Sequence, residues 1–222
     1  MERHTSKQFD QEINTLGARI HAMGKLCEWQ LAKAINAFNH LDKRLADEVI
    51  KADEQVNALH RQAEEEAIAV LARRQPVAMD LRYIVSVIKI ATDFERIGDY
   101  AANISKRVIL LQNRPADAAA GMILDMDKVC RAMINNVLDA FNALDEQLAV
   151  DVWNQDDELD RIFFRFMNTL KKEVGDDGST VEKFADFIFI GRCCERVGDH
   201  ITNVAENIYY TKTGNSYLSD VP

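Results

Sequence analysis

The sequence predicts an all-α protein made of two tandem antiparallel three-helix bundles, six helices that arise from an internal repeat. Proline and glycine are scarce, with 3 and 9 in 222 residues, so long segments contain no helix breaker. Apolar residues recur every three or four positions in these segments, which is the spacing of an amphipathic helix. The second half of the chain repeats the first, so the same helical plan is expected twice. Short turns place successive helices side by side, as in a bundle.

The repeat is clearest in two stretches, residues 91–108 (ATDFERIGDYAANISKRV) and residues 191–208 (GRCCERVGDHITNVAENI). Five residue types recur at a displacement of 100 positions, namely Glu95, Arg96, Gly98, Asp99 and Asn103, which return as Glu195, Arg196, Gly198, Asp199 and Asn203. Residues 37–56 also align without gaps on residues 140–159. We interpret this pattern as an internal duplication of one helical unit.

The first half predicts three helices. A regular apolar stripe predicts the first over residues 7–39, and a tight turn at residues 40–41 follows. Asp42 is placed to cap a second helix, which runs to about residue 74, where Gln75–Pro76 ends it. The third helix is expected over residues 77–112 and carries the first copy of the repeated stretch.

The second half predicts the same plan. The segment Asn113–Asp117 is the best linker, which divides the chain into domains 1–113 and 117–222. Asp145 occupies the position of Asp42, so the helix cap is duplicated. A glycine-flanked turn at residues 175–178 is expected to precede the sixth helix, and residues 215–222 form a short polar tail.

Composition excludes several classes of protein. The net charge of −9 and the lack of a basic stripe argue against nucleic-acid binding and against flat binding to an anionic membrane. No apolar run approaches the roughly 20 residues of a membrane span, and the first residues do not resemble a signal peptide. The four cysteines form no CxxC motif, and Cys27 and Cys130 occupy equivalent repeat positions typical of small core residues. We therefore expect a cytoplasmic protein with reduced cysteines.

The repeated stretch places oxygen-bearing side chains along one side of a helix. Glu95, Asp99 and Asn103 follow each other at four-residue intervals, opposite the apolar stripe. Two like charges four residues apart cost a helix about 0.2–0.5 kcal/mol, and Gly98 costs about 1 kcal/mol relative to alanine. A cation held by the carboxylates would offset the repulsion. The alternative is a solvated acidic face with no ligand.

Distances along the helices bring a further acid to each stripe. Asp53 and the pair Glu95–Asp99 each lie about 30 Å from the turn between their helices, so in an antiparallel pair they reach the same height. Asp156 stands in the same relation to Glu195 and Asp199. Two metal sites are thus predicted, from Asp53, Glu95, Asp99 and Asn103 and from Asp156, Glu195, Asp199 and Asn203. Oxygen-only donors suit magnesium, calcium, manganese or iron, whereas zinc sites usually include His or Cys.

Two kinds of neighbouring residue are expected to be structural. His200 follows Asp199, but its repeat counterpart is Tyr100, so a metal-binding role is not duplicated. Arg96 and Arg196 are expected to pair with the acids beside them.

The motifs ERIGDYAANI and ERVGDHITN and the loop RRQPVAMDLR (residues 73–82) resemble the PhoU family of bacterial phosphate-transport accessory proteins. The resemblance covers nearly the whole chain. It implies two three-helix bundles that bind iron or zinc, in multinuclear clusters, through E(D)xxxD motifs, here Glu95 with Asp99 and Glu195 with Asp199; magnesium or manganese are the other candidates. It also implies a cytoplasmic, homodimeric negative regulator without catalytic activity. Such a protein would link the ATPase subunit of a phosphate ABC transporter to a phosphate-sensing histidine kinase.

The two halves depart from each other in two ways. Cys193 stands where the first copy has Asp93, and no second RQPVA loop occurs, so the halves are expected to differ in metal occupancy. Two other functions stay open. A carboxylate-bridged metalloenzyme is disfavoured because no Glu has a His three residues on, as ferritin-like sites require. A metal-free helical scaffold would use the acids only for solubility.

Overall fold

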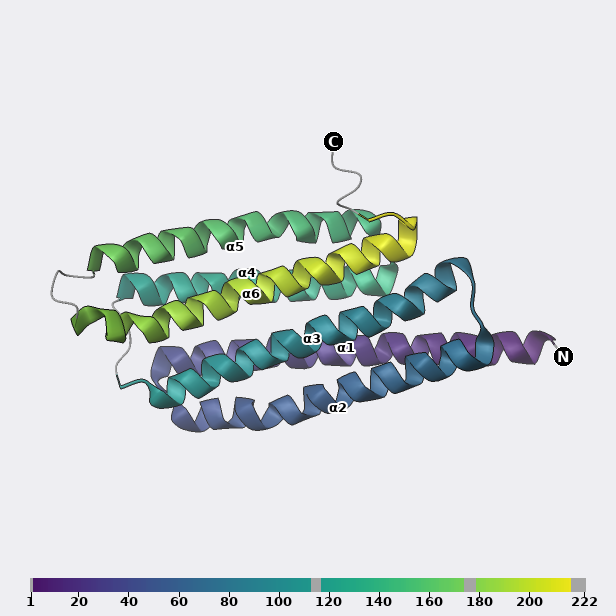
Figure 1. Ribbon diagram of the computed structural model, residues 1–222, viewed down its shortest axis with the longest axis horizontal. Helices are drawn as coiled ribbons and strands as arrows, with labels where there is room; N and C mark the ends of the chain where they lie inside the picture. The colour runs from purple at the N-terminus through teal and green to yellow at the C-terminus, as the bar shows by residue number, and fades with distance from the viewer. Residues whose placement is uncertain (1, 113–116, 174–178, 217–222) are drawn as a thin grey trace.

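The computed structural model describes residues 2–112, 117–173 and 179–216, and these residues form six long helices and no strand (Figure 1). The predicted all-α class is therefore confirmed. The helices are α1 (Glu2–His40), α2 (Lys43–Arg74), α3 (Ala78–Leu110), α4 (Asp117–Ala143), α5 (Glu146–Glu173) and α6 (Ser179–Thr213).

The helices form two antiparallel three-helix bundles that lie side by side. Helices α1, α2 and α3 pack on one another, and so do α4, α5 and α6. The bundles meet where α3 packs against α6 and α1 packs against α4, which leaves α2 and α5 on the outside (Figure 1). Helices α3 and α6 run in opposite directions. Ser86 Oγ near the start of α3 accordingly donates a hydrogen bond of 3.3 Å to the Asn207 carbonyl near the end of α6.

The predicted helix caps are present in both halves. Asp42 Oδ1 accepts a hydrogen bond of 3.0 Å from the Leu45 N–H, and Asp145 Oδ1 accepts 3.0 Å bonds from the N–H groups of Gln147 and Leu148. These bonds satisfy backbone donors that lack partners in the first turn of a helix. At the other end of α2, Gln75 adopts a left-handed conformation with φ of 48° and stops the helix before Pro76.

Some boundaries differ from the prediction. The first helix begins at Glu2 rather than residue 7, because the preceding residues contain no proline or glycine and the apolar stripe marks only the packed part of a helix. The third ends at Leu110 rather than residue 112. Residues 113–116 of the expected linker, the expected turn at 175–178 and the tail from residue 217 lie outside the described residues. The division into domains 1–113 and 117–222 stays a prediction.

Buried apolar side chains from both bundles form one connected core. All four cysteines lie in this core without a disulfide, which confirms the prediction made for Cys27 and Cys130. The Cys27 thiol donates a 3.1 Å hydrogen bond to the Phe94 carbonyl, and the Cys130 thiol makes the equivalent 3.4 Å bond to the Cys194 carbonyl. The repeat thus extends to individual core contacts. None of the described helices has an apolar stretch that is long enough to cross a membrane.

Candidate functional site

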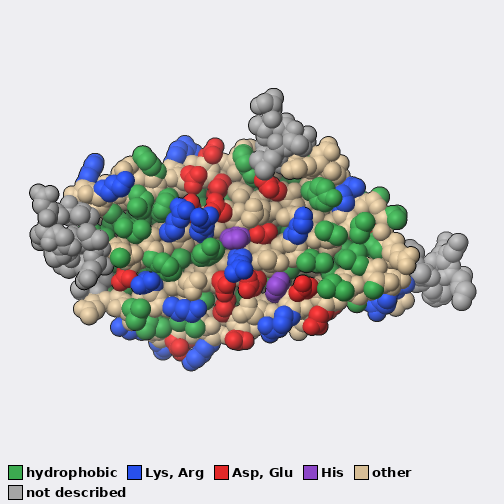
Figure 2. All heavy atoms as spheres, viewed as in Figure 1, with side chains coloured by type: hydrophobic (Ala, Val, Ile, Leu, Met, Phe, Trp, Pro, Cys, Tyr) green, Lys and Arg blue, Asp and Glu red, His purple; other side chains and the backbone are tan. Residues whose placement is uncertain are grey.

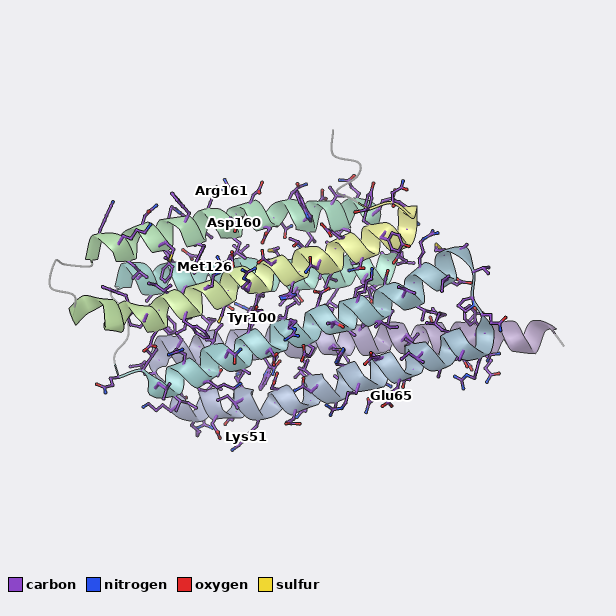
Figure 3. All side chains as sticks on the ribbon, in the orientation of Figure 1. Lys51, Glu65, Tyr100, Met126, Asp160 and Arg161 are labelled. Atoms are coloured by element: carbon purple, nitrogen blue, oxygen red, sulfur yellow. The ribbon has the colours of Figure 1, made fainter. Side chains whose placement is uncertain are left out.

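The predicted acids gather in two clusters at mid-length of the bundles. The first acidic cluster consists of Asp53 from α2 with Glu95 and Asp99 from α3, and the second acidic cluster consists of Asp156 from α5 with Glu195 and Asp199 from α6. Figure 2 shows acidic and basic side chains mixed across the middle of the face on which α3 and α6 lie, with apolar side chains to either side. In Figure 3, Tyr100 lies on α3 where α6 passes, and Asp160 lies on the central part of α5.

A glycine brings the two helices of each cluster together. A methyl group on Gly98 would lie 3.3 Å from Asp53 Oδ1 and 3.2 Å from Val56 Cγ1, so any larger residue there would crowd the second helix. Gly198 is packed more tightly still, against Asp156 and Leu159. Asp53 therefore lies beside the Glu95–Asp99 stripe, as predicted. Asp156 likewise lies beside Glu195–Asp199. Both glycines permit a close approach of carboxylate to backbone.

The acids are less exposed than the helix spacing predicts. The side chains of Glu95 and Glu195 retain 21% and 13% of their exposure, because α2 and α5 cover part of the acidic stripe. The stripe therefore flanks the buried face rather than lying opposite it, and that part of the prediction is wrong. Helix spacing along one chain segment does not specify the angle at which a neighbouring helix packs.

Burial changes the acidity of the clusters. It is the largest cause that raises the pKa of Asp53, Glu95 and Glu195, and the neighbouring Asp99 or Asp199 carboxylate adds to the rise. Burial together with Asp160 and Asp199 raises the pKa of Asp156 to about 7. Each cluster is thus a set of partly desolvated, mutually repelling carboxyl groups.

Three carboxylate oxygens in the clusters are buried without a hydrogen-bond partner among the described residues, namely Asp53 Oδ1, Asp156 Oδ1 and Glu195 Oε2. Buried polar atoms normally have a partner, so unpaired oxygens beside further carboxylates fit the donor set of an oxygen-preferring cation. No group of three His, Cys, Asp or Glu side chains in the described part of the chain is arranged as a complete metal site. A cation would therefore require some rearrangement of these side chains.

Arginines offset part of the negative charge of the clusters in the present arrangement. Arg96 lies 3.6 Å from both Glu95 and Asp99. Arg196 lies 2.9 Å from Asp199, and Arg192 lies 2.8 Å from Glu195. The predicted pairing of Arg96 and Arg196 with neighbouring acids is confirmed. All three guanidinium groups are about half exposed, so they are free to turn toward solvent if a cation takes their place.

The two asparagines are not brought to the predicted partners. Asn103 accepts a 3.2 Å hydrogen bond from Lys106, and Asn203 donates a 3.3 Å bond to Asp93 in the other bundle. His200 Nδ1 lies 2.9 Å from the same Asp93 oxygen, which gives His200 the structural role expected for it. Where α3 and α6 cross, His200 and Asn203 of α6 face α3. Among the described residues, no hydrogen bond joins either asparagine to Asp53 or Asp156, and their role as ligands stays a prediction.

One residue beside the first cluster was missed by the sequence analysis. Gln30 of α1 is fully buried, and its Oε1 would lie 3.1 Å from a methyl group on Gly98. It stands between Cys27 and Leu31 in an otherwise apolar stripe, while its repeat counterpart is Met133. A polar residue on a buried stripe, absent from the second copy, was the signal available in the sequence.

Comparison with known proteins gives consistent results. A sequence model of the PhoU domain matches residues 20–108 and again residues 123–208. The phosphate-specific transport system accessory protein PhoU homolog of Caulobacter vibrioides is 35% identical over 223 residues, which cover 100% of this chain and 97% of that protein. The crystal structure of PhoU from Pseudomonas aeruginosa superposes with a TM-score of 0.88 at 34% identity, covering 93% of this chain and 100% of that one. The phosphate transport system regulatory protein PhoU from Streptococcus pneumoniae gives a TM-score of 0.87 at 26% identity, covering 94% and 98%.

Proposed function

Because the chain belongs to the PhoU family, we propose that it is a cytoplasmic adaptor that regulates phosphate uptake and represses the phosphate-starvation response when phosphate is plentiful. The match of both halves over the full length of an accessory protein is the observation that carries this proposal. The relatives are named as accessory or regulatory proteins of phosphate transport, and this chain is likewise a regulatory protein rather than an enzyme. Its proposed partners are the ATPase subunit of a phosphate ABC transporter, a phosphate-sensing histidine kinase and a second copy of itself.

An exposed apolar turn supports a role in protein contacts. Val77, Met79 and Leu81, at the N-cap and in the first turn of α3, are 74%, 44% and 41% exposed. They lie in the loop that carries the family resemblance, at one end of the first bundle (Figure 1). Ala78 in the same turn has a φ of 50°, a conformation that non-glycine residues rarely adopt. Apolar side chains held in solvent by a strained turn suit a surface that a partner covers.

Cation binding at the two acidic clusters is the second part of the proposal. Iron or zinc is the implied metal, alone or in a multinuclear cluster, with magnesium or manganese as alternatives for an oxygen donor set. Asp53, Glu95 and Asp99 would hold it in the first bundle, and Asp156, Glu195 and Asp199 in the second. A bound cation would lower the repulsion among the carboxylates and fasten α2 to α3 and α5 to α6. The unpaired buried oxygens of Asp53, Asp156 and Glu195 support this role.

Deletion of the gene tests the regulatory role. We expect phosphate-starvation genes to stay active in phosphate-rich medium, and plasmid-borne wild type to restore repression. A double variant, Val77→Ser with Leu81→Ser, should fold normally but fail to restore repression or to retain the transporter in a pull-down, because a partner would have to bury the added hydroxyls.

The matched control is Ile68→Ser, which removes another exposed apolar side chain, 53% exposed, from the surface of α2. It should restore repression fully. Normal repression in the deletion strain would contradict the regulatory role, whereas full activity of the double variant would exclude only the proposed contact surface.

A further inference from the structure

The first acidic cluster contains a buried amide without a well-formed hydrogen bond to the described residues. Gln30 is 0% exposed, and neither its Oε1 nor its Nε2 has a hydrogen-bond partner among the described residues. The amide lies close enough to Asp53 to lower the pKa of that acid as a hydrogen-bond donor does, although the contact is not a well-formed hydrogen bond. An unpaired buried amide is costly, so its retention in an apolar stripe requires a reason.

The amide points at the same place as the carboxylate. Gln30 Oε1 and Asp53 Oδ1 would lie 3.1 and 3.3 Å from a methyl group on Gly98, so both oxygens face the small gap beside this glycine. They come from α1 and α2, while Glu95 and Asp99 approach from α3. Oxygens from α1 and α2 therefore meet beside Gly98, and the Asp99 carboxylate of α3 is close enough to help raise the pKa of Asp53.

The second cluster lacks this arrangement. Met133 is buried at the position equivalent to Gln30 and supplies a thioether in place of an amide oxygen. Leu159 replaces the smaller Val56, and together with Asp156 it packs directly against Gly198. The space beside the glycine is thus lined by two oxygens and a methyl group in the first cluster, and by one oxygen and a methyl group in the second.

We propose that Gln30 makes the two clusters unequal, its amide oxygen completing with Asp53, Glu95 and Asp99 a site that binds a hard divalent cation more tightly than the second cluster does. This inference rests on the cation binding proposed above. Amide and carboxylate oxygens are the donors that hard cations prefer, whereas a thioether is a soft donor with little affinity for them. The half-exposed Arg96 guanidinium would leave Glu95 and Asp99 when the cation binds.

The proposal is tested by exchanging the residue types of the two repeat counterparts, Gln30 and Met133. Titration of the purified metal-free protein with Mn²⁺, followed by the electron paramagnetic resonance signal of free Mn²⁺, reports affinity, and melting temperatures are measured with and without Mn²⁺. Gln30→Met should weaken the tighter binding event about 10- to 100-fold, as loss of a supporting group at a metal site usually does. It should also raise the melting temperature of the metal-free protein, because an unpaired amide is replaced by an apolar group that the other repeat already accommodates.

Three further variants separate ligand and structural roles. Gln30→Glu keeps an oxygen and should retain tight binding, while Met133→Gln should strengthen the weaker event. Ser105→Ala removes another buried, unpaired polar atom, two helical turns beyond Gly98, and should raise the melting temperature without changing Mn²⁺ affinity. Asp199→Ala, which disables the second cluster, identifies the event that belongs to the first.

Unchanged Mn²⁺ affinity in Gln30→Met, or loss of tight binding in Gln30→Glu despite normal folding, would overturn the inference while leaving cation binding intact. If wild type binds neither Mn²⁺ nor added iron or zinc, both this inference and the cation-binding proposal fail. The regulatory role, which rests on the family match and is tested by gene deletion, would be unaffected.

Discussion

Single glycines determine how closely the helices of each cluster approach, and the two repeats differ at this point. A methyl group on Gly98 would lie 3.1–3.3 Å from the side chains of Gln30, Val56 and Asp53, whereas one on Gly198 would overlap Leu159 and Asp156. A substitution that adds one methyl group at the glycine should therefore affect stability differently in each repeat. Helix propensity favours alanine over glycine by about 1 kcal/mol, while overpacking a tight contact costs about 1–3 kcal/mol.

Alanine at the two glycines should accordingly change stability unequally. Gly198→Ala is expected to lower the free energy of unfolding by about 1–2 kcal/mol, because the added methyl group overlaps two side chains. Gly98→Ala should leave it nearly unchanged, since tight contacts of 3.1–3.3 Å with three side chains offset the gain in helix propensity.

Gly121→Ala in α4 is the control for this comparison, because a methyl group there meets nothing within 4 Å and should stabilise the protein by about 1 kcal/mol. Urea unfolding followed by circular dichroism measures all three variants. Equal destabilisation by Gly98→Ala and Gly198→Ala would contradict the difference in packing.

At the scale of the helix, α3 and α6 carry the same unfavourable local features in both repeats. Each has a glycine in its interior and acids four residues apart, and each places these features beside an acid from α2 or α5. Arg96 and Arg196 reduce the repulsion only partly, since ion pairs on half-exposed groups contribute little. The interior glycine and the neighbouring acids destabilise both helices, and yet both repeats contain them. This is more consistent with a ligand-binding role than with a role in stabilising the fold.

Removal of the central acid from both stripes tests the ligand site. Asp99→Ala combined with Asp199→Ala should abolish most binding of iron or zinc while the helical content stays unchanged, because alanine is the better helix former. The metal-free protein should melt at the same or a slightly higher temperature, since repulsion with Glu95 and Glu195 is lost. Elemental analysis and melting curves with and without added metal provide the measurements.

The matched control is Glu54→Ala with Asp157→Ala. It removes the same charge from exposed positions next to Asp53 and Asp156, and it should leave metal content unaltered. Wild-type metal content in the Asp99/Asp199 variant would mean that these stripes are a solvated acidic face.

At the scale of the whole molecule, the two bundles face each other around an approximate two-fold axis. The contact of Ser86 with Asn207 recurs at equivalent repeat positions as the 2.8 Å ion pair between Asp186 and Arg107. The rings of Tyr100 and His200, themselves repeat counterparts, pack at a tilt of 36° with centroids 5.7 Å apart. Contact between equivalent residues places the axis at the crossing of α3 and α6. Both acidic clusters lie beside this crossing, so a cation bound at one cluster would lie close to the interface with the other bundle.

The halves should depend on each other for stability. Because the buried core continues across the α3–α6 and α1–α4 contacts, residues 1–113 and 117–222 expressed separately would each expose apolar surface. We expect each half to be helical but to melt broadly and at lower temperature than the full chain, and we expect mixing to restore a cooperative transition. Circular dichroism and analytical ultracentrifugation provide the measurements. A half that melts as sharply and at the same temperature as the full chain would show that the bundles are independent domains.

The sequence by itself determined the helices, the duplicated caps at Asp42 and Asp145, and the meeting of Asp53 with the Glu95–Asp99 stripe. These features follow from periodicity, local hydrogen bonding and distance along a helix, all of which are properties of nearby residues. Only the tertiary structure decided that Gln30 joins the first cluster, that Asp93 is the partner of His200 and Asn203, and that Glu95 and Glu195 are partly buried. Those outcomes depend on the rotation of each helix about its axis and on the crossing of α3 with α6. Both result from many packing contacts between segments far apart in the chain, and no single stretch of sequence specifies them.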